Sequence, residues 1–254
     1  MTAPSSSTGP VHVVRDDAEA LAIARRLAAD FATGASERDR QRRLPFEEVE
    51  RFSASGLWGI TVPRAFGGAA VSHATLAEVT ALISEADPAL GQIPQNHYCL
   101  VDAVRLIGDA QQQKFFFHEA IEGRRFGNAV SESGTANAKV VTARLRATPE
   151  GLRLDGRKFY CTGALFAHWV PVAAKDEQDK QVLVYVAREA PGLEVVDDWS
   201  GFGQRTTASG TVTADNVAVG ALQVLPRAQL FEPPTIHGPF AQVLHAAIDL
   251  GIGR

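Results

Sequence analysis

The sequence has 254 residues, of which 45% are hydrophobic and 21% charged, and its formal net charge is −4 at pH 7. This composition predicts a globular protein that can bury the core of one large domain or two smaller ones. The negative charge provides no basic field, so it argues against nucleic acid or an anionic membrane as the partner.

The two cysteines and the N-terminal segment indicate the compartment. Cys99 and Cys161 form no CxxC pair, which fits free thiols in a reducing cytoplasm, although a disulfide between them stays open. Residues 1–14 lack the basic and apolar regions of a signal peptide, and we expect them to be a disordered tail. No stretch of about 18 apolar residues suggests a membrane span.

Apolar residues at three- and four-residue spacing predict helices in the first half of the chain. Asp16 is a plausible N-cap of the first helix, which Gly34 should end, and Pro45 should begin the second. Gly56 is a typical C-terminal stop of that helix, and Ser72 is a candidate cap of the third.

Two further helices follow. Pro88 and Gly91 are expected to end the third helix, and the fourth and fifth should occupy residues 93–106 and 109–123. Residues 15–123 are therefore predicted to form an all-α N-terminal domain.

The pattern changes after Gly123, where alternating and β-branched runs separated by turn residues become frequent. We predict an antiparallel, β-barrel-like middle domain over residues 124–233, with a hairpin turn at Asp155-Gly156. Helical spacing returns after Pro239 and is still present at Arg254, so residues 234–254 are expected to be the first helix of a truncated C-terminal helical domain. The predicted fold class is multi-domain α+β.

Two short motifs are better explained by structure than by function. GFGQRT at 201–206 lacks the third glycine of a dinucleotide fingerprint and precedes a β-rich run instead of a helix. HEAIE at 118–122 has Glu122 where a zinc helix needs its second histidine. We therefore predict neither a nicotinamide site nor a metal site.

Three longer strings resemble the acyl-CoA dehydrogenase superfamily of flavoenzymes: GNAVSESG at 127–134, GLRLDGRKFYCTG at 151–163 and GFGQRTTASGTVTADNVAV at 201–219. Within it, LGQIPQNHY, KFYCTGALFAHWVPV and DDWSGFGQRTTASGTV look most like the sulfur-acquisition oxidoreductases, relatives of dimethyl sulfone and dibenzothiophene monooxygenases. True dehydrogenases carry Thr-Glu-Pro-Gly-Ala-Gly-Ser-Asp where residues 131–138 read SESGTANA, and this departure argues against a CoA thioester substrate.

The resemblance implies a cytoplasmic flavin-dependent oxidoreductase, a monooxygenase that uses reduced FMN and dioxygen to oxidise a small organosulfur compound in sulfur acquisition. It further implies a separate flavin reductase and a homotetramer. FAD is the alternative cofactor. The alternative functions are an FAD-dependent acyl-CoA dehydrogenase and a non-catalytic fragment that acts as a binding or assembly module.

The resemblance also assigns candidate flavin contacts. Gly163, next to Cys161 at the end of a strand, would admit the isoalloxazine ring, and the Thr162 hydroxyl would bond near N5. Ser131 would bond the pyrimidine side of the ring. Two neighbours would line the ring or phosphate, namely Val130 and Ser133.

Three more residues have open assignments. His97 matches a histidine near the oxygen-reacting face, where it could move a proton, but a buried structural histidine explains it equally well. Asn128 could orient the substrate. Arg205 would bond a flavin phosphate or fasten a turn. Trp169 and Trp199 are interpreted as packing residues.

Overall fold

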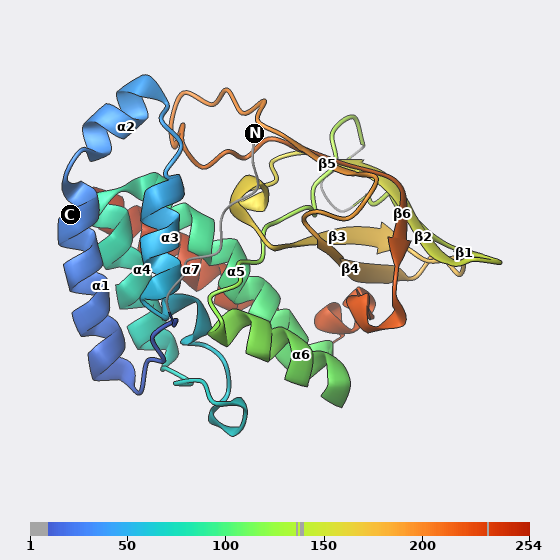
Figure 1. Cartoon of the computed structure of the whole chain (residues 1–254), viewed down its shortest axis with the longest axis horizontal. Helices are drawn as coiled ribbons and strands as arrows, with labels where there is room; N and C mark the ends of the chain where they lie inside the picture. The colour runs from blue at the N-terminus through green and yellow to red at the C-terminus, as the bar shows by residue number, and fades with distance from the viewer. Residues whose placement is uncertain (1–9, 136, 138–139, 233) are drawn as a thin grey trace.

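The chain folds into a layer of helices beside a twisted β-sheet (Figure 1). The computed structural model describes residues 10–135, 137, 140–232 and 234–254. Most of the predicted N-terminal tail, residues 1–9, lies outside the described residues.

In the described part of the chain, six α-helices precede the sheet: α1 (Asp17–Ala32), α2 (Ala35–Gln41), α3 (Phe46–Ala54), α4 (His73–Ala86), α5 (Pro88–Ile107) and α6 (Ala110–Ile121). Two predicted caps are observed, because the side chains of Asp16 and Ser72 accept hydrogen bonds from the first turns of α1 and α4. The sequence pattern missed α2, which begins directly after Gly34.

The third predicted helix, α4, does end just before Pro88, at Ala86, but the prediction that Gly91 ends a helix is wrong. Asp87 caps α5, Pro88 is its first residue, and Gly91 lies inside it. A Cβ at Gly91 would lie 1.9 Å from the Ser84 Oγ of α4. The glycine therefore permits two helices to approach closely, and it ends neither of them.

The described residues form a sheet of seven strands in the order β5-β6-β2-β1-β3-β4-β7. Their bounds are β1 Arg144–Thr148, β2 Gly151–Lys158, β3 Trp169–Lys175, β4 Gln181–Ala187, β5 Leu193–Val196, β6 Thr211–Val219 and β7 Val224–Leu225. Helices followed by a sheet confirm the α+β fold class. Two details of the prediction need correction. The sheet of described residues is open, with β5 and β7 at its edges, and β1 pairs with β3 in parallel.

The predicted hairpin turn at Asp155-Gly156 is also misplaced. Thr148 pairs with Gly151, so the chain turns at residues 149–150, while Asp155 and Gly156 lie within β2 where its register with β6 shifts. A Cβ at Gly156 would lie 2.4 Å from the Ala143 side chain. The glycine is thus required by a close approach in the sheet.

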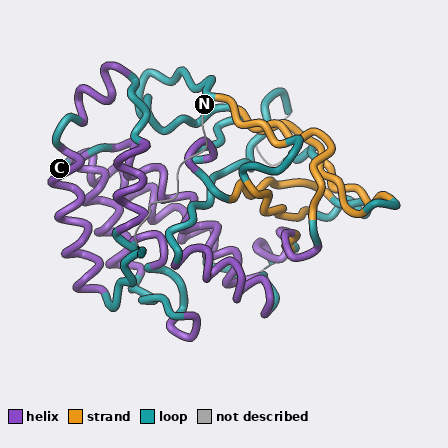
Figure 2. The backbone as a smooth tube through the Cα atoms, in the orientation of Figure 1, coloured by secondary structure: helices purple, strands orange, loops and turns teal. Residues whose placement is uncertain are grey.

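The last helix, α7 (His237–Gly253), returns to the helical layer and packs against α4 and α5 (Figures 1 and 2). A Cβ at Gly251 would lie 2.3 Å from the Ala81 carbonyl oxygen of α4. No helix in the described part of the chain has both the length and the apolar character to span a membrane.

Buried aromatic side chains join the sheet to the helices. The ring of Tyr185 on β4 lies 4.5 Å from that of Phe116 on α6, and its hydroxyl donates to the Leu100 carbonyl of α5 at 2.7 Å. A second connection links Arg42, after α2, to Asp197 in the segment between β5 and β6. These contacts hold the ends of the strands beside the helical layer.

Candidate functional site

Two segments that are distant in sequence lie side by side at the end of β2. The Asn128 N–H donates to the Thr162 carbonyl at 3.0 Å, and the Phe159 N–H donates to the Ser131 carbonyl at 2.9 Å. The Asn128 amide also donates to the Tyr160 carbonyl at 3.3 Å. We call Asn128, Ser131, Tyr160, Thr162 and Ser209 the strand-end site.

A row of three buried hydroxyls runs through this site. Thr162 Oγ1 lies 2.7 Å from Ser209 Oγ, which lies 2.8 Å from Thr207 Oγ1. Thr207 Oγ1 in turn donates to the Gln204 carbonyl at 3.0 Å. The segment between β5 and β6 therefore supports the Thr162 side chain from behind.

The neighbours of Thr162 point elsewhere. Cys161 is 1% exposed and packs in the core of the sheet, where burial raises the pKa of its thiol to about 12. Gly163 has φ of +76° at the start of η3 (Ala164–Phe166), and its α-carbon faces Ile93 of α5. A left-handed turn accounts for this glycine without an approaching ring.

The segment after Asn128 presents free hydroxyls. Among the described residues, the side chains of Ser131 and Ser133 have no hydrogen-bond partner, whereas Val130 packs against the core between the layers. Between the two serines, Glu132 forms a buried ion pair with Lys158 at 2.5 Å. Burial opposes ionisation of Glu132, but bonds from Lys158, Thr142 and Ala143 outweigh it and lower its pKa to about 2. The pair fastens this segment to β2 and leaves Glu132 unsuited to act as a base.

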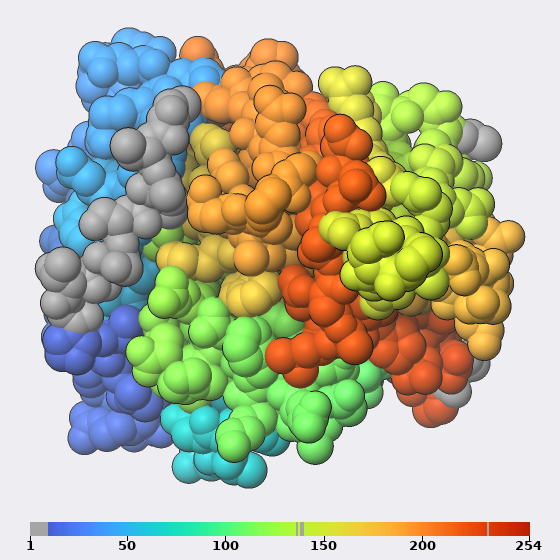
Figure 3. All heavy atoms as spheres, turned by 45° about the vertical axis from the view of Figure 1, so that its right-hand side comes forward, coloured from blue at the N-terminus to red at the C-terminus, as the bar shows by residue number. Residues whose placement is uncertain are grey.

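Exposed aromatic side chains border the strand-end site. Tyr160 is 62% exposed, and its ring lies 6.1 Å from that of Trp199. Phe202 is fully exposed in the same segment, which lies on the surface beside the helical layer (Figure 3, orange beside blue). Trp169, by contrast, bonds Glu119 through its indole N–H at 2.7 Å, in agreement with a packing role.

Arg205 lies in a different hollow. It lines a cavity of about 630 Å³ between α2 and the start of α5, together with Gln204 and Thr206. Its guanidinium has no partner among the described residues. No hydrogen bond within this part of the chain joins it to the strand-end site.

His97 lies in the core and not on an open face. It is fully buried, its Nε2 lies 2.9 Å from the Trp58 carbonyl, and its Nδ1 lies 3.1 Å from the Phe126 N–H. The carbonyl can only accept and the N–H can only donate, so Nε2 carries the proton of a neutral ring. Burial lowers the pKa of His97 to about 3. This geometry favours the structural explanation of His97 over proton transfer at a reacting face.

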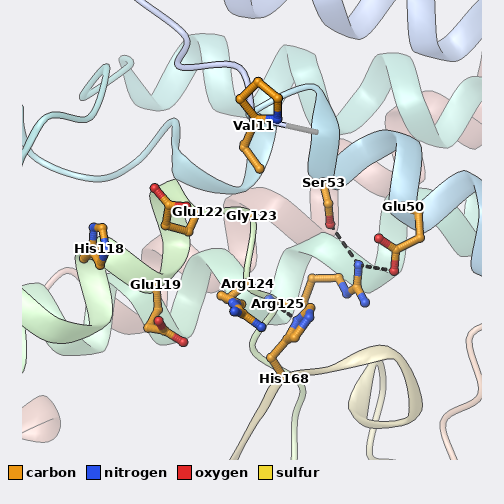
Figure 4. A pocket seen from close by; sticks show the side chains of 11 residues that line it. Val11, Glu50, Ser53, His118, Glu119, Glu122, Gly123, Arg124, Arg125 and His168 are labelled. Carbon is orange, nitrogen blue, oxygen red and sulfur yellow. Dashed lines mark hydrogen bonds and ion pairs between the residues drawn. The ribbon is translucent and has the colours of Figure 1, made fainter. Parts of the chain in front are cut away.

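A separate cavity of about 290 Å³ lies where α3 and α6 meet the turn before β3 (Figure 4). Its deepest charge, Arg125, bonds Ser53 at 2.9 Å and Glu50 at 2.8 Å. His168 accepts the Arg125 backbone N–H at 3.2 Å. These groups already have partners within the protein, so the cavity is part of the junction between the layers.

Three residues of this region were not predicted from the sequence, namely Thr207, Ser209 and Tyr160. Thr207 and Ser209 belong to the string TTASG, in which a high density of small polar residues before a strand was the only available signal. Tyr160 has φ of +56°, which is uncommon for an aromatic residue, and this can be recognised only in the structure.

Comparisons with known proteins agree with this architecture. Residues 16–124 match the family described as acyl-CoA dehydrogenase, N-terminal domain. A dibenzothiophene monooxygenase from Rhodococcus erythropolis is 32% identical over 94% of the chain, and the probable FMNH2-dependent monooxygenase SfnC from Pseudomonas putida is 30% identical over 92%. The chain spans 60% and 59% of these relatives. FMN-bound TdsC from Paenibacillus sp. A11-2 superposes with a TM-score of 0.86 at 28% identity, covering 92% of this chain and 62% of the other.

Proposed function

Because residues 16–124 match the acyl-CoA dehydrogenase N-terminal domain family, we propose that the chain is a flavin-dependent monooxygenase that uses reduced FMN to oxidise a small organosulfur compound. The names of its relatives, a dibenzothiophene monooxygenase and a probable FMNH2-dependent monooxygenase, support this reading. The structural observation that carries it is the strand-end site, where hydroxyls and an amide gather beside exposed aromatic rings.

The strand-end site fits a flavin ring chemically. Ser131 has a hydroxyl without a protein partner, and Thr162 has lone pairs in excess of its bond to Ser209. Tyr160 and Trp199 provide apolar surface at the border, as expected for a site that binds a flat heterocycle. Bound reduced flavin would supply the electrons that activate dioxygen.

The protein residues would hold the flavin, orient the substrate and shield the site from water. Thr162 would bond at N5 and Ser131 at the pyrimidine edge, with Val130, Cys161 and Gly163 shaping the backbone behind the ring. Asn128 would orient the substrate through its amide, while Tyr160 and Trp199 limit access of water. Ser133 and Arg205 are the candidate partners of the phosphate, since both lack protein partners among the described residues.

His97 would contribute by position. Its Nδ1 accepts the N–H of Phe126, two residues before Asn128. We therefore assign it the role of holding the segment that carries Asn128 and Ser131, in place of direct proton transfer.

The same proposal includes partners and location. A separate flavin reductase would supply reduced FMN, since GFGQRT leads into a strand and does not form a nicotinamide motif. Free Cys99 and Cys161 fit a reducing cytoplasm. A homotetramer remains part of the proposal.

The test is a titration with FMN and FAD in oxidised and anaerobically reduced forms, monitored by flavin fluorescence and absorbance. We expect reduced FMN to bind most tightly, and Thr162→Val and Ser131→Ala to weaken binding by roughly tenfold, the value of one hydrogen bond. Thr148→Val is the matched control, because this hydroxyl bonds Gly151 at the far end of the β1–β2 hairpin.

Each alternative function predicts a different result. Preferred binding of FAD, with bleaching on addition of an acyl-CoA, would indicate a dehydrogenase. A folded chain that binds no flavin in any form would indicate a binding or assembly module. If reduced FMN binds, oxygen consumption with sulfones, sulfinates and dibenzothiophene then identifies the substrate class.

A further inference from the structure

We propose that Thr207 and Ser209 make the strand-end site selective for reduced flavin by fixing the direction of the Thr162 hydroxyl. The proposal rests on the proposed function, because it takes the flavin N5 to lie beside Thr162. It identifies two positioning residues that select a redox state without touching the cofactor.

The direction of the hydroxyl row follows from its anchored end. The Gln204 carbonyl can only accept, so the single O–H of Thr207 is donated to it. Ser209 must then donate to Thr207, and Thr162 must donate to Ser209. Thr162 Oγ1 is left with lone pairs alone, so it can only accept a hydrogen bond from a ligand.

The Gln204 carbonyl, which anchors the row, is held in place by two further hydrogen bonds. The Gln204 carbonyl also accepts the Trp199 indole N–H at 3.1 Å and the Thr207 backbone N–H at 3.2 Å. The three hydroxyl-bearing residues are buried, with exposed fractions of 8% for Thr162, 1% for Thr207 and 7% for Ser209. Water therefore has little access to compete for the hydroxyl protons, and a reversed row would leave the Thr207 oxygen without its carbonyl partner.

Backbone strain surrounds the same row. Among the described residues, seven non-glycine residues have positive φ, and three of them flank the hydroxyls: Tyr160 at +56°, Gln204 at +47° and Ala208 at +48°. Such conformations each cost roughly 1–3 kcal/mol and persist where the surrounding structure enforces them, often at functional sites. Their clustering is independent of the hydrogen bonds and indicates that this geometry is imposed.

The two redox states of the flavin differ in hydrogen bonding at N5. In reduced flavin N5 carries a hydrogen and can donate to an acceptor, whereas in oxidised flavin N5 presents a lone pair. A Thr162 oxygen that can only accept thus bonds the reduced form and opposes the oxidised form. A separate reductase delivers the reduced form, so this preference would favour loading and favour release after reoxidation.

The experiment compares dissociation constants for reduced and oxidised FMN in this chain and in Thr207→Val and Ser209→Ala. We expect the wild-type chain to bind reduced FMN at least tenfold more tightly. Either substitution frees the Thr162 O–H to donate, so the ratio should fall about tenfold and the potential of bound flavin should fall by about 30 mV for two electrons.

Two controls separate this effect from general damage. Thr207→Ser keeps the hydroxyl and should retain the wild-type ratio. Thr148→Val removes a hydroxyl that bonds Gly151 at the far end of the β1–β2 hairpin, and it should leave the ratio unchanged.

The results distinguish the two proposals. If both forms of FMN bind but the ratio is the same in wild type, Thr207→Val and Ser209→Ala, the selection mechanism is wrong and the flavin site stands. If the wild-type chain binds neither form, the proposed function fails and the selection mechanism fails with it.

Discussion

Two regions of this molecule bury polar side chains, and they use them in different ways. In the helical layer, Arg38 is 2% exposed and donates to Asp87, Glu48 and two backbone carbonyls. These bonds engage all five N–H donors of the guanidinium. At the strand-end site, the hydroxyl row of Thr207, Ser209 and Thr162 ends in an oxygen that can still accept.

In a fold rich in buried polar groups, a binding site is recognised by the hydrogen-bonding capacity that its side chains leave unused. A group whose bonding capacity is filled within the protein can stabilise the fold but offers nothing to a ligand. A supported row that ends in an oxygen with spare accepting capacity can do both. By this criterion we assign structural roles to Arg38 and His97 and propose a functional role for Thr162.

The strongest test of the comparison is Arg38→Met. It leaves the buried carboxylates of Asp87 and Glu48 without their main counter-charge, and breaking such a pair costs about 3–5 kcal/mol of unfolding free energy. Urea unfolding measures the loss. Arg43→Met is the matched control, because Arg43 also contacts Glu48 but is half-exposed, so we expect at most about 1 kcal/mol. Equal losses for the two variants would show that burial of Arg38 is not decisive.

Substitution of His97 separates its two hydrogen bonds. Asn can place an oxygen near Nδ1 and keep the Phe126 bond, whereas Gln can place its amide near Nε2 and keep the Trp58 bond. Each leaves one buried backbone group unpaired, at a cost of about 1–3 kcal/mol. Only His97→Gln should also weaken FMN binding, because it releases the segment before Asn128. Normal stability and lost oxygenation in both variants would instead restore His97 to the reacting face.

Protonation of the same histidine predicts how stability depends on pH. The folded pKa of His97 is about 3 and its ordinary value 6.5, so between these values the unfolded chain binds a proton that the folded chain does not. Stability should therefore be complete above pH 6.5 and fall on acidification, by about 1.4 kcal/mol per pH unit from this group. His168, whose pKa is also lowered to about 3, adds in the same direction. Chemical denaturation from pH 4 to 8 should show a shallower slope in His97→Asn, and identical slopes would contradict the assignment.

Local signals in the sequence predicted the helices well and the sheet less well. The caps at Asp16 and Ser72 are short-range events, and they are observed. Gly91 and Gly156 were wrongly interpreted as a helix end and a turn. Each is needed instead for close contact with a residue outside its own element: Gly91 with Ser84, and Gly156 with Ala143. The domain boundaries at 15–123, 124–233 and 234–254 stay a prediction.

The candidate site could be predicted only in part for a related reason. The string around Cys161 and Thr162 marked the end of the strand, but the direction of each side chain depends on the turn that Gly163 makes there. Thr207 and Ser209 are more than forty residues away in sequence, and no periodicity connects hydroxyls of separate segments. Long-range hydrogen bonds of this kind become visible only in the folded chain.

The last substitution tests why position 163 is a glycine. Its φ of +76° disfavours any residue with a Cβ, and a Cβ there would contact the Ile93 side chain at an ordinary 3.5 Å. Gly163→Ala should therefore cost about 1–2 kcal/mol from conformation alone. Gly134→Ala is a fitting control, because Gly134 has the same φ and no described atom would lie within 4 Å of an added Cβ. We expect Gly163→Ala and Gly134→Ala to lose similar stability in thermal unfolding, and Gly163→Asn to lose less because Asn tolerates this conformation. This result would establish the backbone explanation. If Gly163→Ala keeps its stability but loses FMN binding, the glycine is instead required by the flavin ring, and the boundary between structural and functional residues in this turn moves by one position.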